Sequence, residues 1–240
     1  MRAAGGRLRW VPASGIALAI LWAPIVLVIP LLPDLGSPAE IRPFYRAHTD
    51  LLQAVIVCIS AGYLPLLAFL GGLVERLRVE VGEGPLPWLV LASAVVFMTA
   101  LNVALGLDAA AALLFDAADP EATYELHTAG FLLAAPAAFA GVAFFAALAA
   151  SCFLGAFNHW LGWLAVAGAV ANVGAIGGVL SLTGPLNSGN GLIGGIALPV
   201  GMWLLWIVLA SIAWLREPDA DAPFPAGEPR SVKAQTGTRS

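Results

Sequence analysis

Two short stretches of the chain carry the same pattern of polar residues, Tyr-x-x-His-Thr. The first runs from Tyr45 to Thr49 and the second from Tyr124 to Thr128. A tyrosine and a histidine three residues apart share one face of a helix. Each copy also has a carboxylate close by, Asp50 in the first and Glu125 in the second. These residue types could bind one ligand if the chain brings the two copies together.

The chemistry that such a cluster suggests is metal or haem binding. Two imidazoles with nearby carboxylates suit a divalent metal, and an imidazole pair can serve as the axial ligands of a haem. The candidate residues are His48, His127, Tyr45, Tyr124, Asp50 and Glu125, with Asp108 or Asp116 as further carboxylates. We assign no cofactor from the sequence and expect none. A metal or haem site is therefore one hypothesis, and the simpler alternative is that both histidines are hydrogen-bonded residues at the membrane boundary.

The composition indicates the environment in which these residues lie. Residues of the set AVILMFWYC make up 60% of the 240 residues and only 11% are charged, whereas about 25% of a soluble domain is charged. The charged residues are clustered, which leaves uncharged windows long enough to cross a hydrocarbon core of about 30 Å. The sequence therefore predicts an all-α integral membrane protein. The sequence has no basic patch large enough to read DNA or RNA, which excludes nucleic-acid binding.

Six apolar segments follow one another along the chain and predict a polytopic transmembrane helical bundle over residues 1–215. The expected spans are about 11–32, 51–74, 86–107, 128–149, 161–182 and 192–214. The first span contains prolines that predict a kink, and the Ala-rich stretch 109–115 either lengthens the third span or forms an outer helix. Residues 216–240 have too few apolar side chains to offset chain entropy, which predicts a disordered cytoplasmic tail.

The distribution of Lys and Arg predicts the orientation of the bundle. With the N-terminus in the cytoplasm, the outer loops hold only Arg42 and Arg46. The cytoplasmic side then holds Arg2, Arg7, Arg9, Arg76, Arg78, Arg216, Arg230, Lys233 and Arg239. This excess follows the positive-inside rule. We expect a multi-pass protein of the cell membrane, surrounded by the lipid bilayer, with both termini cytoplasmic and the loop 108–127 outside.

The Tyr-x-x-His-Thr pattern belongs to a longer repeat, because each copy precedes an apolar span, an inner turn and a tryptophan, Trp88 or Trp163. Spans two and three are then predicted to repeat as spans four and five in parallel orientation. Helix starts at Ser37-Pro38 and Asp119-Pro120 predict two helices that extend beyond the membrane. The two histidines could meet there across a pseudo-two-fold axis. The alternative is that both are hydrogen-bonded residues at the membrane boundary and that the repeat is an old duplication or a coincidence.

Groups that usually support catalysis or ion coupling are missing from the predicted spans. No Asp, Glu, Lys, Arg or His lies well inside a span, and the motifs of zinc, serine and nucleotide chemistry are absent. Asn102 and Asn172 are deep polar residues that either hydrogen-bond between helices, which we favour, or line a solute path. Cys58 and Cys152 are too far apart in depth for a disulfide.

Small residues predict where the last two spans touch. Gly174 and Gly178 are four residues apart in span five, and Gly191 and Gly195 have the same spacing at the start of span six. Such pairs allow close helix contact in lipid. The alternative is chance in a chain that has 26 glycines.

The stretch from Ser37 to Trp214 resembles an uncharacterised family of six-span bacterial integral membrane proteins. The resemblance rests on Ala68-Phe69-Leu70-Gly71-Gly72-Leu73 followed by Arg76 and Arg78, on Asp119-Pro120-Glu121, and on Trp160-Leu161-Gly162-Trp163-Leu164. The turn before the last motif is basic in that family, whereas here it reads Phe157-Asn158-His159. The resemblance implies a six-span bundle and no particular activity.

We therefore expect a non-enzymatic membrane protein without catalytic residues, which is structural, senses a signal or binds a partner. Its partner would be another membrane protein. One alternative is a small-solute transporter or channel with Asn102 and Asn172 along its path. A second alternative is a haem- or metal-binding protein that uses His48 and His127.

Overall fold

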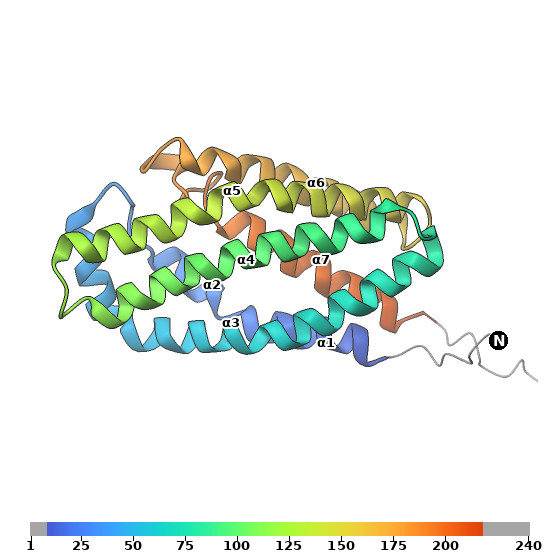
Figure 1. Ribbon diagram of the computed structural model, residues 1–240, viewed down its shortest axis with the longest axis horizontal. Coiled ribbons are helices and arrows are strands. Elements are labelled where there is room, and N and C mark those ends of the chain that lie inside the picture. Colours follow the sequence, from blue (N-terminus) through green and yellow to red (C-terminus); the bar gives the residue numbers. More distant parts are fainter. Residues whose placement is uncertain (1–8, 218–240) are drawn as a thin grey trace, which may run out of the picture.

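The computed structural model describes residues 9–217, except the side chains of residues 26 and 27, and its regular elements there are all helical. The α-helices are α1 (Trp10–Trp22), α2 (Ile25–Val28), α3 (Pro38–Val81), α4 (Pro85–Leu114), α5 (Pro120–Phe153), α6 (His159–Ile176) and α7 (Ala197–Leu215). Short 3-10 turns are η1 (Ile29–Leu31), η2 (Gly177–Val179) and η3 (Gly184–Leu186). The long helices lie side by side in an elongated bundle (Figure 1). Apart from its first two residues, the predicted tail lies outside the described residues.

Five helices are long and apolar enough to cross a membrane: α3, α4, α5, α6 with its 3-10 extension, and α7. They coincide with predicted spans two to six, which confirms the prediction of a helical membrane protein. The first predicted span is a broken helix. Helix α1 ends at Trp22 and α2 begins after Pro24, because proline lacks the N–H that would continue the helix and its ring crowds the preceding turn.

Helices α3 and α5 extend well beyond their predicted spans. Helix α3 has 44 residues, so at a rise of 1.5 Å per residue it is about 66 Å long, roughly twice the thickness of a hydrocarbon core. It begins at Pro38, and α5 begins at Pro120 with Asp119 accepting a hydrogen bond from the backbone N–H of Glu121. Both helix starts are thus confirmed. Helix α4 continues to Leu114, so the Ala-rich stretch lengthens the third predicted span.

The last two predicted spans are shorter than expected, because α6 ends at Ile176 and α7 begins only at Ala197. The Gly-rich segment between them folds back onto α6. A Cβ on Gly178 would lie 2.7 Å from the carbonyl oxygen of Gly194. Gly174 and Gly178 therefore do allow a close approach, but to this segment rather than to α7. A run of glycine and turn-forming residues does not sustain a helix.

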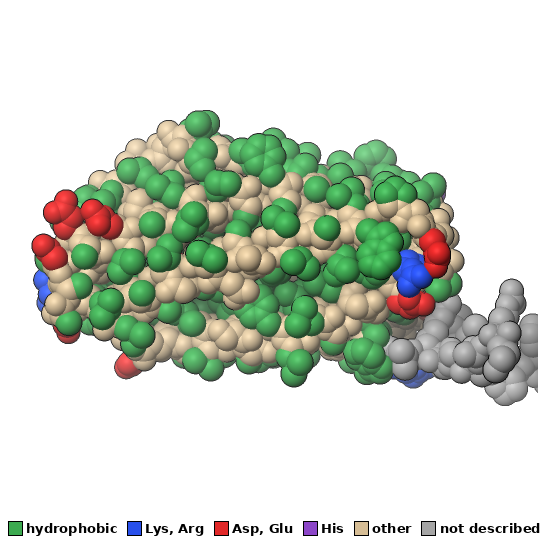
Figure 2. Space-filling view, in the orientation of Figure 1, with side chains coloured by type: hydrophobic (Ala, Val, Ile, Leu, Met, Phe, Trp, Pro, Cys, Tyr) green, Lys and Arg blue, Asp and Glu red, His purple; other side chains and the backbone are tan. Residues whose placement is uncertain are grey.

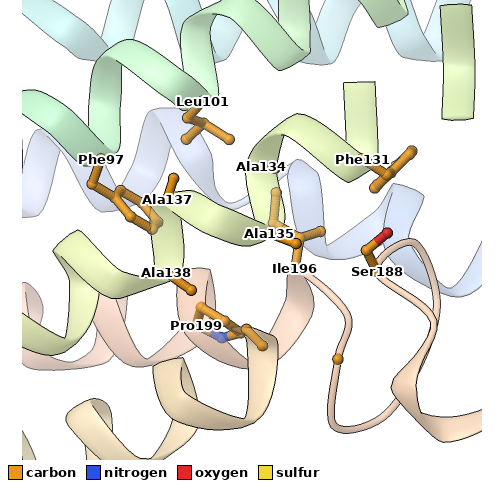
Figure 3. Close-up of a pocket in the computed structure, with 12 residues that line it drawn as sticks. Phe97, Leu101, Phe131, Ala134, Ala135, Ala137, Ala138, Ser188, Ile196 and Pro199 are labelled. Atoms are coloured by element: carbon orange, nitrogen blue, oxygen red, sulfur yellow. The ribbon is translucent and has the colours of Figure 1, made fainter. Parts of the chain in front are cut away.

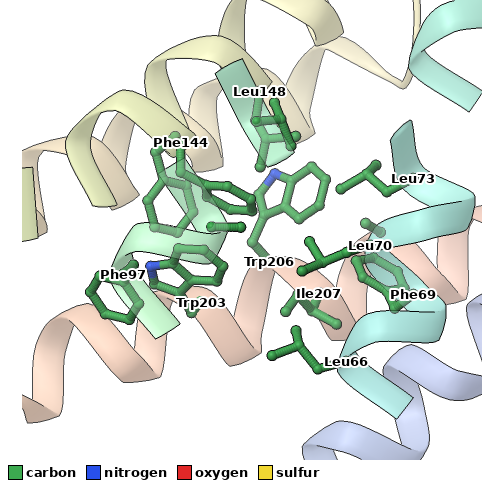
Figure 4. Packing of buried hydrophobic residues seen from close by; sticks show 14 of the residues in the cluster. Leu66, Phe69, Leu70, Leu73, Phe97, Phe144, Leu148, Trp203, Trp206 and Ile207 are labelled. Atoms are coloured by element: carbon green, nitrogen blue, oxygen red, sulfur yellow. The ribbon is translucent and has the colours of Figure 1, made fainter. Parts of the chain in front are cut away.

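Aromatic side chains of α7 hold the core of the bundle together (Figure 4). The Trp203 ring stacks on Phe97 of α4 and Phe144 of α5, with centroid distances of 4.9 and 3.8 Å. Trp206 donates its indole N–H to the carbonyl oxygen of Leu161, at 3.1 Å. Cys58 and Cys152 are both free, as predicted.

Charged side chains gather toward the two ends of the bundle, and the surface between them is apolar or uncharged (Figure 2). At the end where α1 begins and α7 ends, Arg76 of α3 donates to the backbone oxygen of Ala156 and to both carboxylate oxygens of Glu217. Its guanidinium lies 4.1 Å from the ring centre of Phe157 and 4.9 Å from that of Trp214. This side chain joins α3, the turn between α5 and α6, and the end of α7.

Replacement of Arg76 should destabilise the bundle. The Arg76 side chain is only 11% exposed, so Arg76→Gln leaves buried acceptors without a partner and should cost about 2–4 kcal/mol. Arg78→Gln is the matched control, because Arg78 pairs with the exposed side chains of Glu75 and Glu83, and such pairs contribute at most about 1 kcal/mol. Thermal unfolding in one detergent measures both variants. Equal midpoints for the two variants would show that the buried ion pair has no structural role.

Candidate ligand-binding site

Three helices bring polar side chains together at the end of the bundle opposite Arg76. Tyr45 lies on the part of α3 that precedes its predicted span, Asp108 lies near the end of α4, and His127 lies on α5. Gly130 allows α4 and α5 to approach closely here. A Cβ on Gly130 would lie 3.1 Å from the carbonyl oxygen of Ala104 and 3.4 Å from Oδ2 of Asp108. We call Tyr45, Asp108 and His127 the polar cluster.

The three side chains of the polar cluster are within hydrogen-bonding distance of one another. The Tyr45 hydroxyl is 2.8 Å from Nδ1 of His127 and 3.2 Å from Oδ1 of Asp108. Nδ1 of His127 is 3.1 Å from the same Oδ1. Tyr45 and His127 are each 1% exposed, whereas the Asp108 side chain is 22% exposed.

One assignment of hydrogen atoms satisfies the distances within the polar cluster. A carboxylate only accepts, so the network is satisfied when the Tyr45 hydroxyl and the Nδ1–H of His127 both donate to Oδ1 of Asp108. Burial raises the pKa of Tyr45 above its ordinary value, and the charge and hydrogen bond of Asp108 raise it further. The phenol is therefore protonated at physiological pH and available as a donor.

Two atoms of the polar cluster are left without a hydrogen-bond partner. Nε2 of His127 is buried and unpaired. Within residues 9–217, only Oδ1 of Asp108 is engaged, so Oδ2 has no hydrogen bond. With the Nδ1–H tautomer, both unpaired atoms are acceptors. Because more than nine in ten buried polar groups in native structures are paired, the unpaired Nε2 of His127 is a departure that a ligand or ordered water would correct.

The polar cluster lines a cavity of about 70 Å³. The other lining residues are all apolar: Ile25, Val28, Ile29, Leu32, Phe44, Leu52, Val55, Ile56, Ile59, Leu101, Leu105, Phe131 and Ile196. A smaller cavity of about 20 Å³ shares Leu101, Phe131 and Ile196 with it (Figure 3). The larger cavity is thus an apolar space with one polar group of residues in its wall, which is the usual composition of a small-molecule site.

The remaining predicted site residues lie around the polar cluster rather than in it. His48 has Nδ1 3.0 Å from the carbonyl oxygen of Phe44, and its ring contacts the Phe44 ring. Tyr124 is half-buried and packs beside Tyr45, whereas Asp50 and Glu125 are exposed. In the described part of the chain, no three His, Cys, Asp or Glu residues are placed to hold a metal ion together. Binding of a metal or haem by His48 and His127 stays a prediction.

The repeat brings the tyrosine of one copy to the histidine of the other. Tyr45 contacts His127, but no hydrogen bond or ring contact between described residues joins Tyr124 to His48. A two-fold relation would produce both contacts, so the site is asymmetric, and the parallel repeat of spans stays a prediction. Sequence reasoning named Asp108 only as one of two nearby carboxylates, since spacing along the chain does not indicate which acid faces α5.

The two deep asparagines differ in their surroundings. Asn102 is exposed on the outer surface of α4. Asn172 is fully buried, donates to the carbonyl oxygen of Gly168 at 2.8 Å, and packs on Gly141, where a Cβ would lie 1.9 Å from its Oδ1. The contacts of Asn172 are those of a residue that packs one helix against another.

Comparison of the chain with models of known protein families, with curated proteins and with solved structures found no match. The resemblance to a family of six-span bacterial membrane proteins therefore stays a prediction.

Removal of the Tyr45 hydroxyl tests the polar cluster. Tyr45→Phe takes one donor from Asp108 and should lower the free energy of unfolding by about 1–2 kcal/mol. Tyr124→Phe is the control supplied by the second copy of the pattern, because the structure shows no hydrogen bond to that hydroxyl among the described residues. Its effect should stay within about 0.5 kcal/mol. Thermal unfolding in detergent gives both values, and a larger effect of Tyr124→Phe would contradict the assigned network.

Proposed function

We propose that this protein is a non-enzymatic, multi-pass membrane protein that binds a small, largely apolar molecule in the 70 Å³ cavity, and that it serves as a binding or sensing subunit. The observation that carries this proposal is an apolar cavity whose wall includes a buried histidine with an unpaired nitrogen. Among the buried side-chain atoms without a hydrogen-bond partner in the described residues, Nε2 of His127 is the one whose side chain lines this cavity. An unpaired buried polar group costs about 1–3 kcal/mol. A bound molecule that reaches the polar cluster would remove that cost.

The origin of the cavity wall supports a sensing role. Its residues come from α2, η1, α3, α4, α5 and the segment that precedes α7. A molecule in the cavity would contact all of these segments at once. Occupancy can therefore shift the equilibrium between arrangements of the helices, provided that the ligand binds one arrangement better than another.

We further propose six spans with both termini in the cytoplasm. The broken first segment, α1 to η1, covers Trp10 to Leu31, which at helical rise is about 33 Å and sufficient to cross the hydrocarbon core. Among described residues, Arg9, Arg76, Arg78 and Arg216 belong to the end where α1 begins, and Arg42 and Arg46 to the other end. This asymmetry supports a cytoplasmic location for the Arg76 end.

Labelling of single cysteines tests the orientation. In a background with Cys58→Ser and Cys152→Ala, a maleimide that does not cross membranes should label Ala117→Cys in intact cells. It should label Glu83→Cys only after the membrane is opened, because the two exposed positions lie in the turns at opposite ends of α4. The reverse pattern would place the Arg76 end outside.

Binding of n-hexane tests the cavity itself. In lipid nanodiscs, the δ1-methyl NMR signals of Ile59 and Ile196, which line the cavity, should shift and saturate as n-hexane is added. The signal of Ile20, which is 68% exposed on the outer surface, should follow only the amount of n-hexane in the lipid.

Two variants of α3 separate cavity binding from an effect of n-hexane on the lipid. Val55→Phe fills the cavity and should abolish the saturable shifts, because Val55 lines it and is 5% exposed. Val57→Phe makes the same change at a position that is 66% exposed and should leave the shifts intact. Shifts of Ile59 and Ile196 that never saturate, or that survive Val55→Phe, would overturn the proposed function.

A further inference from the structure

Asp108 places a carboxylate in the wall of an otherwise apolar cavity. Its side chain is 22% exposed, and none of the other described residues that line the cavity is an acid. Oδ1 accepts from Tyr45 and His127, whereas Oδ2 has no hydrogen bond within the part of the chain that the structure describes. One oxygen of the carboxylate is thus held in a fixed position, and the other remains available to a ligand.

No arginine or lysine neutralises Asp108 within residues 9–217. The two arginines at this end of the bundle, Arg42 and Arg46, are both directed to Asp116. The ionic contact of Asp108 is with His127, and an imidazole that donates through Nδ1 and leaves Nε2 unprotonated is neutral. With that neutral imidazole, no described residue of the cavity wall carries a positive charge. Withdrawal of a carboxylate from water without a countercharge is costly, so a cationic ligand would offset this cost.

The unpaired atoms of the polar cluster specify the hydrogen bonding of a ligand. Oδ2 of Asp108 and Nε2 of His127 both accept, so the ligand must donate. An ammonium group carries three donors and a positive charge, and its hydrogen bonds to a carboxylate are about twice as strong as those between neutral groups. A hydroxyl group offers one donor and no charge. An anionic head group would be repelled.

The charged residues on the surface around the polar cluster also favour a cation over an anion. The acids at this end besides Asp108 are Asp34, Glu40, Asp50, Asp116, Asp119, Glu121 and Glu125, against Arg42 and Arg46. Acidic side chains gather at this end of the molecule in Figure 2. A surface of one predominant sign raises the local concentration of ions of opposite charge, so cations are favoured on approach as well as inside.

We propose that the ligand of the cavity is a lipophilic amine, in which an apolar chain or ring carries one ammonium group that binds Asp108. This inference rests on the proposed function, because it specifies the chemical class of the molecule that fills the same cavity. The apolar lining would hold the hydrocarbon part, and the polar cluster would hold the charged nitrogen.

Three probes with equal numbers of heavy atoms test the inference: n-pentylamine, n-pentanol and n-hexane. The Ile59 and Ile196 methyl signals in nanodiscs give each Kd, expressed as the concentration of probe in the lipid and measured with protein-free nanodiscs. The amine should bind about tenfold or more tightly than n-hexane, since one charge-assisted hydrogen bond is added. n-Pentanol should fall between the two.

Charge variants then locate the binding group. Asp108→Asn should remove the preference for the amine, so that n-pentylamine binds the variant no more tightly than n-hexane does. The saturable shift with n-hexane in the same variant reports whether the cavity persists. Asp116→Asn makes the same change in net charge at an exposed side chain paired with Arg46 and should keep the preference. If Asp108→Asn fails to fold, the order of the three probes in the unaltered protein decides the question.

The outcomes separate the two proposals. If n-pentanol or n-hexane binds as tightly as n-pentylamine, or if Asp108→Asn retains the preference for the amine, the inference is wrong while the cavity remains a binding site. If none of the three probes gives a saturable shift, the proposed function fails together with the inference.

Discussion

The hydrocarbon core of a membrane forces every backbone N–H and C=O group within it to be paired inside the chain, and the architecture of this protein follows from that constraint. Long helices satisfy it, and the five apolar helices α3 to α7 contain no cluster of charges in their central parts. Charged groups of the described residues are therefore confined toward the ends of the bundle. The two ends use them differently. Arg76 forms a closed network in which its donors are matched by Ala156 and Glu217. In the polar cluster at the other end, Nε2 of His127 has no hydrogen-bond partner among the described residues.

The length of α3 and α5 is what allows the polar cluster to exist. Had these helices ended at the predicted membrane boundary near residues 51 and 128, Tyr45 and His127 would belong to loops with uncertain positions. Their helical extensions, which begin at Pro38 and Pro120, place both side chains on rigid elements. Rigid elements hold a binding group more precisely than loops do. Side chains with a fixed hydrogen-bonding direction then form one wall of the apolar cavity.

Much of this arrangement could be predicted from the sequence, because it depends on local properties. Uncharged windows predicted the five long helices, and Ser-Pro and Asp-Pro pairs predicted where α3 and α5 begin. The Tyr-x-x-His-Thr pattern drew attention to Tyr45 and His127, which the structure places in contact, but the contact predicted from it was between His48 and His127. Two features could not be predicted in this way. The choice of Asp108 as their partner depends on the rotation of α4 and on the close approach at Gly130, and the fold-back of the segment before α7 depends on packing against Gly178.

The asymmetry of the repeat is informative about function. If the two copies served only to pack α3 against α5, the contact of Tyr45 with His127 and that of Tyr124 with His48 would be equally useful, and both would be expected. Only the first is present among the described residues, and it is the one that lies beside Asp108 and the cavity. His48 instead has its Nδ1 beside the carbonyl oxygen of Phe44, on its own helix. A histidine that is buried, oriented by a carboxylate and left with one free nitrogen is costly for stability alone. Its place in the wall of the apolar cavity is the observation on which the proposal of a ligand rests.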